Sequence, residues 1–244
     1  MSSIQEHYEK LLAKHYSWMF GDYDAKVQEN LGFFRKHEAT PRLSKRAIDL
    51  GCGSGFQSIA LANLGFKVLS IDISPTLLAE LEGHRESRDI RTVCADMLDF
   101  HEYCSQSKAE VVVCMGDTLT HLRSFDEVLF LFRKVYEHME SDGLFFLSFR
   151  DLTIEPRGVD RIIPVRSDES TIMTAFLEYE NEHVNVHDVI YTKQNNGWHL
   201  NKSCYKKLRI GAEWAKRQLE SIGFKLVSDE TGNGLITIIA SKPA

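Results

Sequence analysis

Three acidic residues stand at the ends of three successive apolar segments of the chain. Asp49 precedes the glycines of AIDLGCGSG (Ala47–Gly55), Asp72 closes the next segment, and Asp96 follows the one after it. A carboxylate at the end of a second strand can accept two hydrogen bonds from a ribose diol. Each aspartate alone fits a helix cap or a solvated loop about as well. Their repetition after three segments in a row favours one shared binding site.

The glycine loop is the sharpest signal in the sequence. Gly51, Gly53 and Gly55 separate a strand pattern from a helical one, and a backbone without Cβ atoms can turn tightly and approach a ligand. The helix that follows begins with unpaired N–H groups. The dinucleotide fingerprint requires a glycine where Phe56 stands, which disfavours a nicotinamide dehydrogenase. Cys52 is interpreted as a small loop residue, because no base is assigned to it.

Strand and helix patterns alternate between residues 46 and 149. The expected strands are Arg46–Leu50, Lys67–Ile73, Ile90–Cys94, Glu110–Met115 and Leu144–Phe149. This alternation indicates an α/β fold with a doubly wound, mostly parallel sheet. The ligand of such a sheet should lie beyond the carboxyl ends of the strands, near the first one.

The pattern changes after residue 150. Four strand patterns follow one another without helices: Arg161–Arg166, Thr171–Glu180, His183–Thr192 and Trp198–Ile210. Asn196-Gly197 predicts a hairpin turn between the last two, and a final hairpin is expected around Gly232-Asn233-Gly234. The expected parts are an N-terminal helical cap (1–45) with a break near Gly21-Asp22, a cofactor-binding core (46–150), an antiparallel β insertion (151–210), and a C-terminal helix and hairpin that complete the core sheet (211–244).

The loop resembles motif I of class I S-adenosylmethionine (SAM) methyltransferases, D-x-G-x-G-x-G after a first strand. The resemblance implies a Rossmann-like, seven-stranded methyltransferase sheet and SAM as the cofactor. In that family the loop lies against the methionyl part of SAM. This contact falls on Asp49, Gly51, Gly53 and Gly55, with Cys52 inside the loop.

The same resemblance implies roles for residues after the next two strands. Asp72 would hold the ribose, with Ile73 against the adenine. Asp96 would contact the adenine amino group, and Met97 would line the base. In small-molecule methyltransferases of this type an aromatic N-terminal segment closes over SAM. Tyr16 is the residue expected to touch the cofactor, although ordinary helix packing explains it nearly as well.

The segment VVVCMGDTLTHL (Val111–Leu122) marks the expected acceptor side. Met115 ends the fourth strand beside the cofactor, and Asp117 would face the methyl-transfer region. No proline follows Asp117, which disfavours the amino-methyltransferases that act on nucleic-acid bases. The segment is similar instead to the G-N-S-x-A-H-L pattern of glycine and sarcosine N-methyltransferases. Asp117 could accept a hydrogen bond from an amine or cap the turn that leads to His121.

Arg150 follows the fifth strand, where those enzymes carry H-R-N/D and use the arginine to hold the substrate carboxylate. Phe149 replaces the histidine here. A guanidinium group is a fixed cation whose bidentate fork suits a carboxylate. A surface ion pair with Asp151 or Glu155 is the alternative. Asp117 and Arg150 are therefore the predicted catalytic residues.

Composition and charge narrow the classes of partner and the compartment that are expected for the protein. The net charge is -6, with 29 basic and 35 acidic residues, which disfavours a nucleic-acid partner. No secretory signal is visible, and the longest apolar stretch, Gly143–Phe149, is too short to cross a bilayer. Five scattered cysteines without a CxxC pair suit a cytoplasmic protein. His183 and His187 would be about 13 Å apart on a strand, so no metal is expected.

The sequence thus predicts a SAM-dependent methyltransferase for a small molecule, with the amine of an amino-acid-like compound as acceptor. An O-methyltransferase, a methyltransferase of a protein or RNA, and a SAM-binding protein without catalysis stay open as alternatives. A homo-oligomer is compatible with the sequence. The protein would mainly orient the reactants and exclude water.

Overall fold

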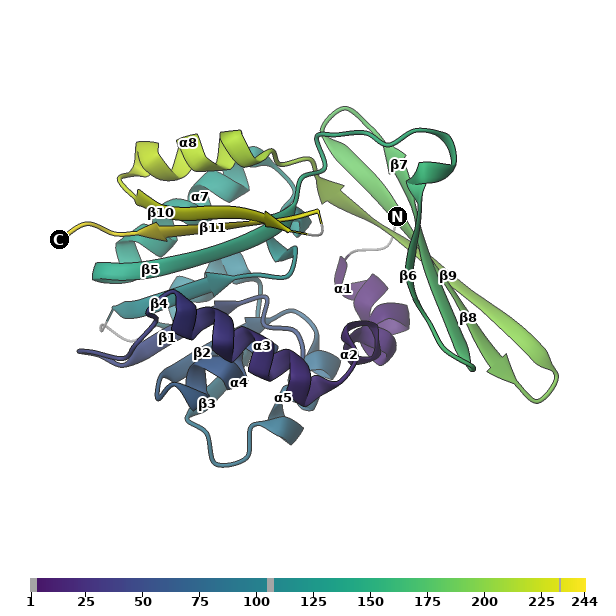
Figure 1. Ribbon diagram of the computed structural model, residues 1–244, viewed down its shortest axis with the longest axis horizontal. Coiled ribbons are helices and arrows are strands. Elements are labelled where there is room, and N and C mark those ends of the chain that lie inside the picture. Colours follow the sequence, from purple (N-terminus) through teal and green to yellow (C-terminus); the bar gives the residue numbers. More distant parts are fainter. Residues whose placement is uncertain (1–3, 105–107, 233) are drawn as a thin grey trace.

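The computed structural model describes residues 4–104, 108–232 and 234–244. Figure 1 shows a large sheet covered by helices and a smaller sheet beside it. The strands of the large sheet are β1 (Arg46–Leu50), β2 (Lys67–Asp72), β3 (Ile90–Cys94), β4 (Ala109–Cys114), β5 (Met139–Arg150), β10 (Lys225–Gly232) and β11 (Leu235–Ser241). They are hydrogen-bonded in the order β10-β11-β5-β4-β1-β2-β3.

Strands β1 to β5 run parallel, and β11 is antiparallel to both β5 and β10. The order steps outward in both directions from β1 and β4, so the carboxyl ends of the two central strands face a crevice. The predicted fold class, a doubly wound seven-stranded sheet with an antiparallel insertion after the fifth strand, is confirmed.

Two helical layers bury the two faces of the large sheet. The first layer contains α3 (Tyr23–Lys36), α4 (Phe56–Asn63) and α5 (Pro75–His84), and the second contains α7 (Phe125–His138) and α8 (Ala212–Ile222). In β4, Val111 and Val113 pack toward the first layer, while Val112 and Cys114 pack toward the second. A strand that is buried on both faces needs apolar residues at every position, which explains its continuous apolar run. Each buried valine stabilises the fold by about 1.5–3 kcal/mol, so the centre of the sheet is a firm base for the site.

The smaller sheet contains β6 (Ile162–Ser167), β7 (Thr171–Tyr179), β8 (His183–Gln194) and β9 (Gly197–Leu208), in that order and antiparallel throughout. Its inner face packs on the N-terminal segment, where Leu11 and Leu12 meet Met173 and Ile190. Figure 1 shows the N-terminal helices between the two sheets. The first residues of the chain therefore help to hold the insertion to the core.

The N-terminal segment is less regular than the sequence pattern predicts. It consists of α1 (Ile4–His7), a π-helical turn η1 (Tyr8–Leu12), a 3-10 turn η2 (Ala13–His15) and α2 (Tyr16–Phe20). The predicted break is present, because Gly21 has a φ of 95° and the side chain of Asp22 accepts a hydrogen bond from the N–H of Ala25 at 2.7 Å. The irregular turns bring residues from several sides of the segment toward the cavity described below.

A few predicted boundaries differ from the structure. Strand β5 begins at Met139 rather than Leu144, because a register shift in β4 places Met139 beside Ala109. Gln194 pairs with Gly197, so the turn is Asn195-Asn196 rather than Asn196-Gly197. In the final hairpin Asn233 lies outside the described residues. The four-part division of the chain stays a prediction.

The remaining short helices are η3 (Met97–Asp99), α6 (Phe100–Tyr103), η4 (Thr118–His121) and η5 (Gly158–Arg161). Among all helices in the described ranges, none is long and apolar enough to cross a membrane.

Candidate active site

A cavity of about 770 Å³ opens at the carboxyl ends of β1, β2, β3 and β4. This is the edge predicted from the alternating pattern, and the volume lies in the range of small-ligand sites. The predicted cofactor residues that line it are Tyr16, Gly51, Gly53, Asp72, Ile73, Asp96 and Met97. Four further ones, Asp49, Cys52, Gly55 and Met115, are not part of its described lining.

Asp72 links the glycine loop to the end of β2. Its Oδ2 accepts a hydrogen bond from the N–H of Gly53 at 2.8 Å, and its Oδ1 accepts one from the N–H of Ser74 at 2.8 Å. Burial raises the pKa of the carboxyl, and these N–H groups act in the opposite direction. A carboxylate has about four acceptor directions, so the side chain keeps capacity for a ligand diol.

Neighbouring side chains crowd two positions of the glycine loop. Gly51 has a φ of 68°, and a Cβ there would lie 2.1 Å from Cγ2 of Thr118. Gly53 has a φ of 52°, and a Cβ there would lie 3.0 Å from the ring of Tyr16. Positive φ values and close neighbours thus favour glycine at both positions, and contact of this loop with the methionyl part of SAM stays a prediction.

Asp49 supports the loop from behind. It is 2% exposed, and its Oδ2 accepts a hydrogen bond from the hydroxyl of Ser58 at 2.6 Å. The pKa of Asp49 is raised to about 7, mainly by burial and further by the charge of Asp72, while the hydrogen bond from Ser58 acts in the opposite direction. Cys52 is also buried, and burial raises the pKa of its thiol, as expected for a loop residue without nucleophilic character.

Asp96 and Met97 form the cavity wall beyond β3. Oδ1 of Asp96 accepts a hydrogen bond from the N–H of Leu98 at 2.9 Å and so caps the short helix η3. The cap and the cavity contact are compatible, because only one oxygen is used. Met115 is partly buried against the first helical layer, and its carbonyl accepts the hydroxyl of Thr118 at 2.9 Å.

The N-terminal segment covers this cavity. Glu9 accepts hydrogen bonds from the hydroxyl groups of Ser74 and Thr76 at 2.5 and 2.6 Å. Nε2 of Gln5 donates to the carbonyl of Ile73 at 3.0 Å. Tyr16 lies over Gly53, and burial raises the pKa of its hydroxyl. Tyr16 thus lines the cavity as expected, its contact with the cofactor stays a prediction, and the polar anchors Gln5 and Glu9 have no signal in the sequence.

His121 lines the cavity beyond β4. Its Nε2 lies 3.4 Å from the hydroxyl of Tyr8, and its ring centroid lies 5.5 Å from that of Tyr205. Burial and, to a smaller extent, the charge of Lys207 lower the pKa of His121 to about 3, while Asp117 acts in the opposite direction. A neutral imidazole therefore faces the cavity. Sequence reasoning matched His121 to the G-N-S-x-A-H-L pattern but gave it no role.

The two predicted catalytic residues take different positions. Asp117 is 6% exposed and pairs with Lys207, while its Oδ1 accepts the N–H of Arg150 at 2.9 Å. The side chain of Arg150 is exposed at the end of β5, near Gly234. Neither residue is among the described lining of the cavity. Their predicted roles stay predictions, and Asp117 is engaged with protein groups.

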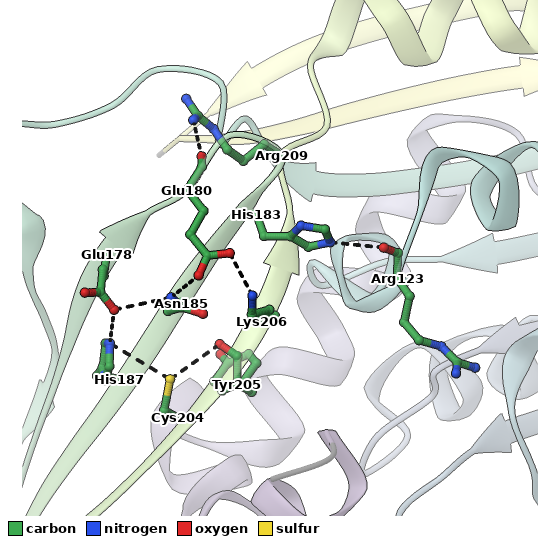
Figure 2. A network of polar contacts seen from close by, with 10 residues as sticks. All are labelled: Arg123, Glu178, Glu180, His183, Asn185, His187, Cys204, Tyr205, Lys206 and Arg209. Atoms are coloured by element: carbon green, nitrogen blue, oxygen red, sulfur yellow. Dashed lines mark hydrogen bonds and ion pairs between the residues drawn. The ribbon is translucent and has the colours of Figure 1, made fainter. Parts of the chain in front are cut away.

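Polar residues from the insertion and the core meet at the outer part of the cavity, and Figure 2 shows them. Lys206 lines the cavity, and its Nζ lies 2.7 Å from Oε2 of Glu180. The other carboxylate oxygen of Glu180 accepts a hydrogen bond from the side chain of Asn185. Nε2 of His183 lies 3.0 Å from the carbonyl oxygen of Arg123. The contact of His183 ties β8 to the residues just before α7, while those of Glu180 link β8 and β9 within the smaller sheet. Within the described parts of the chain no group of three metal-ligating side chains comes together.

Residues 47–143 match the family model of a methyltransferase domain. The cypemycin N-terminal methyltransferase of a Streptomyces species is 32% identical over 111 residues, covering 46% of this chain and 44% of that protein. The glycine/sarcosine N-methyltransferase of Aphanothece halophytica is 31% identical over 110 residues, covering 44% and 41%. The matches thus span less than half the length of these curated relatives.

A solved structure has the same fold over nearly the whole chain. The SAM-bound amino pentose methyltransferase of Micromonospora echinaspora gives a TM-score of 0.73 at 15% identity, covering 95% of this chain and 96% of that one. Residues 47–143 are thus similar to a methyltransferase domain, and the predicted resemblance to class I SAM-dependent methyltransferases is confirmed.

Proposed function

We propose that this protein transfers the methyl group of SAM to the amine of a small acceptor. The observation that carries the proposal is one cavity with two kinds of lining. Beyond β2 and β3 it presents the carboxylates of Asp72 and Asp96, and beyond β4 it presents the neutral imidazole of His121. The first lining suits a nucleoside, and the second suits an amine that must keep its lone pair.

The cofactor end is assigned to the predicted residues. Asp72 would hold the ribose hydroxyl groups, Asp96 and Met97 would hold the adenine together with Ile73, and Gly51 would let the methionyl part approach the backbone. Asp49, Cys52, Gly55 and Met115 would shape this end from behind. Tyr16 would close it and exclude water.

At the acceptor end, His121 and Tyr8 would orient the nucleophile. SAM would supply a methyl carbon bonded to a positively charged sulfur. The neutral thioether S-adenosylhomocysteine is then a good leaving group. An unprotonated nitrogen of His121 can accept an N–H hydrogen bond from the amine and so direct its lone pair at the methyl carbon. The carbon–sulfur bond breaks as the carbon–nitrogen bond forms, and the nitrogen then releases one proton.

The relatives support an amine acceptor. The names of the two curated relatives and of the amino pentose enzyme refer to an N-terminus, to glycine or sarcosine, and to an amino sugar. These names agree on nitrogen-containing acceptors and differ in size and charge. An amino acid or an amino sugar is therefore the acceptor class to test first.

The test is release of S-adenosylhomocysteine from SAM over a panel of amino acids, amino sugars and phenols. Turnover with amines, lowered about tenfold or more in kcat/KM by His121→Phe at unchanged SAM affinity, is the expected result. Turnover with phenols alone would replace the proposal by an O-methyltransferase. Tight SAM binding without turnover would point to a macromolecular acceptor or to a binding protein.

A further inference from the structure

A buried ion pair lies behind the acceptor end of the cavity. Nζ of Lys207, on β9, pairs with Oδ2 of Asp117, and the two side chains are only 11% and 9% exposed. Asp117 begins the turn that carries His121, whereas Lys207 belongs to the smaller sheet. The pair therefore joins the insertion to the acceptor turn at a point shielded from water.

The carboxylate of Asp117 is held by further donors. Its Oδ1 accepts the N–H of Arg150 at 2.9 Å and the hydroxyl of Thr120 at 3.2 Å. Its backbone has a φ of 79°, a conformation that side-chain residues rarely adopt. Contacts to β5, to β9 and within the turn itself hold this strained turn, and with it the ring of His121, in one place.

Several residues that titrate lie near the ring of His121. They are Tyr8 from η1, His7 from α1, Tyr205 and Lys207 from β9, and Asp117 from its own turn. Burial lowers the pKa of His121, Lys207 and His7 act in the same direction, and Asp117 acts in the opposite one. Lys207 is thus the fixed cation that offsets the carboxylate beside the imidazole.

We propose that Lys207 is a positioning residue for methyl transfer, which fixes the acceptor turn through Asp117 and keeps a positive charge next to the ring of His121. The inference rests on the proposed function, in which His121 contacts the acceptor amine. A protonated imidazole cannot accept the N–H hydrogen bond and repels the positively charged sulfur. Without Lys207, the unpaired carboxylate of Asp117 would favour that protonated form.

Two substitutions should move the protonation of His121 in opposite directions. Lys207→Met leaves the carboxylate of Asp117 without its cation and should raise the pKa of His121 above that of the wild type, whereas Asp117→Asn should not raise it. The histidine Cε1–H NMR signal, assigned with His121→Phe, reports this without any turnover. In assays, Lys207→Met should lose about tenfold or more in kcat, and the loss should grow as the pH falls, with SAM affinity retained.

Controls separate charge from packing. Lys207→Arg keeps the charge and should behave like the wild type, as should Lys202→Met on the exposed face of the same strand. The double substitution of Asp117→Asn with Lys207→Met removes both charges, so it serves if the single variant does not fold. A His121 signal that titrates no higher in Lys207→Met than in the wild type would overturn the inference. Failure to find any acceptor would count against the proposed function, while the NMR titration would still decide the role of Lys207.

Discussion

The carboxylate of Asp72 accepts the backbone N–H of Gly53 at 2.8 Å, across the gap between the end of β2 and the glycine loop. Its other oxygen accepts the N–H of Ser74, at the start of α5. One side chain therefore holds together the loop and the next helix start, and it faces the cavity as well. Loss of its charge should weaken the cofactor site in two ways.

We expect Asp72→Asn to weaken SAM binding about 10–100-fold. Hydrogen bonds to a charged group contribute about 1.5–3 kcal/mol, and each 1.4 kcal/mol corresponds to tenfold in affinity. Isothermal titration calorimetry measures the effect directly. Asp89→Asn is the matched control, because Asp89 is exposed before β3 and lies away from the cavity. Equal affinities of the two variants would refute the assignment.

Two glycines in neighbouring elements should respond oppositely to alanine. Gly55 has a φ of 92°, and a Cβ there would lie 2.2 Å from Leu81, so Gly55→Ala should destabilise the fold by about 2–4 kcal/mol. Gly83 lies within the helix α5, with nothing within 4 Å of an added Cβ, and Gly83→Ala should stabilise it by about 0.5–1 kcal/mol. Urea unfolding monitored by circular dichroism checks both, and equal midpoints would contradict the steric argument.

The residues at the cofactor end of the cavity could be predicted because their positions follow from short segments of the sequence. Asp72 and Asp96 follow strands whose apolar runs are visible in the sequence, and parallel strands bring their carboxyl ends to one edge. The loop glycines indicate a backbone with positive φ, because glycine adopts that conformation more readily than other residues. Both signals need only neighbouring residues.

The acceptor end could not be predicted in the same way. The partner of Asp117 is Lys207, 90 residues further along the chain and on the inserted sheet. No periodicity connects the two, since the contact depends on how the insertion packs on the N-terminal segment. The anchors Gln5 and Glu9 escaped prediction for the same reason, because their partners lie more than 60 residues away.

The pH dependence of stability should reveal the buried carboxyl of Asp49. Its pKa is about 7 in the folded protein and about 3.9 when unfolded, so the folded state binds more protons between these values. The contribution of this group to stability therefore falls as the pH rises from about 4 to 7. Asn has no charge to bury, and Asp49→Asn should gain about 2–3 kcal/mol relative to the wild type between pH 5 and pH 8.

Urea unfolding at both pH values measures this gain for Asp49→Asn. The exposed Asp24→Asn controls for the general pH dependence of the protein. If the free energies of unfolding of Asp49→Asn and the wild type differ by the same amount at pH 5 and pH 8, Asp49 is already ionised at pH 5 in the folded protein.

Arg150 and Lys206 are competing candidates for an acidic group on the acceptor. The sequence predicts Arg150, so Arg150→Ala should raise KM for a carboxylate-bearing amine while SAM affinity stays constant. In the structure Lys206 lines the cavity, whereas Arg150 is not among its described lining residues. Nζ of Lys206 has three donors, and Glu180 accepts one at 2.7 Å. We therefore expect Lys206→Ala to have the larger effect, a rise in KM of about 5–20-fold, as for a charge-assisted hydrogen bond that is partly exposed to solvent.

The comparison is made with one amine in two forms, the free acid and its methyl ester. If Lys206 binds the carboxylate, Lys206→Ala raises KM for the acid and leaves that of the ester nearly unchanged. Lys202→Ala, on the exposed part of β9, should alter neither value. A rise in KM for the acid in Arg150→Ala but not in Lys206→Ala would return the carboxylate to Arg150. That outcome would require the guanidinium group to swing from the end of β5 into the cavity when the acceptor binds.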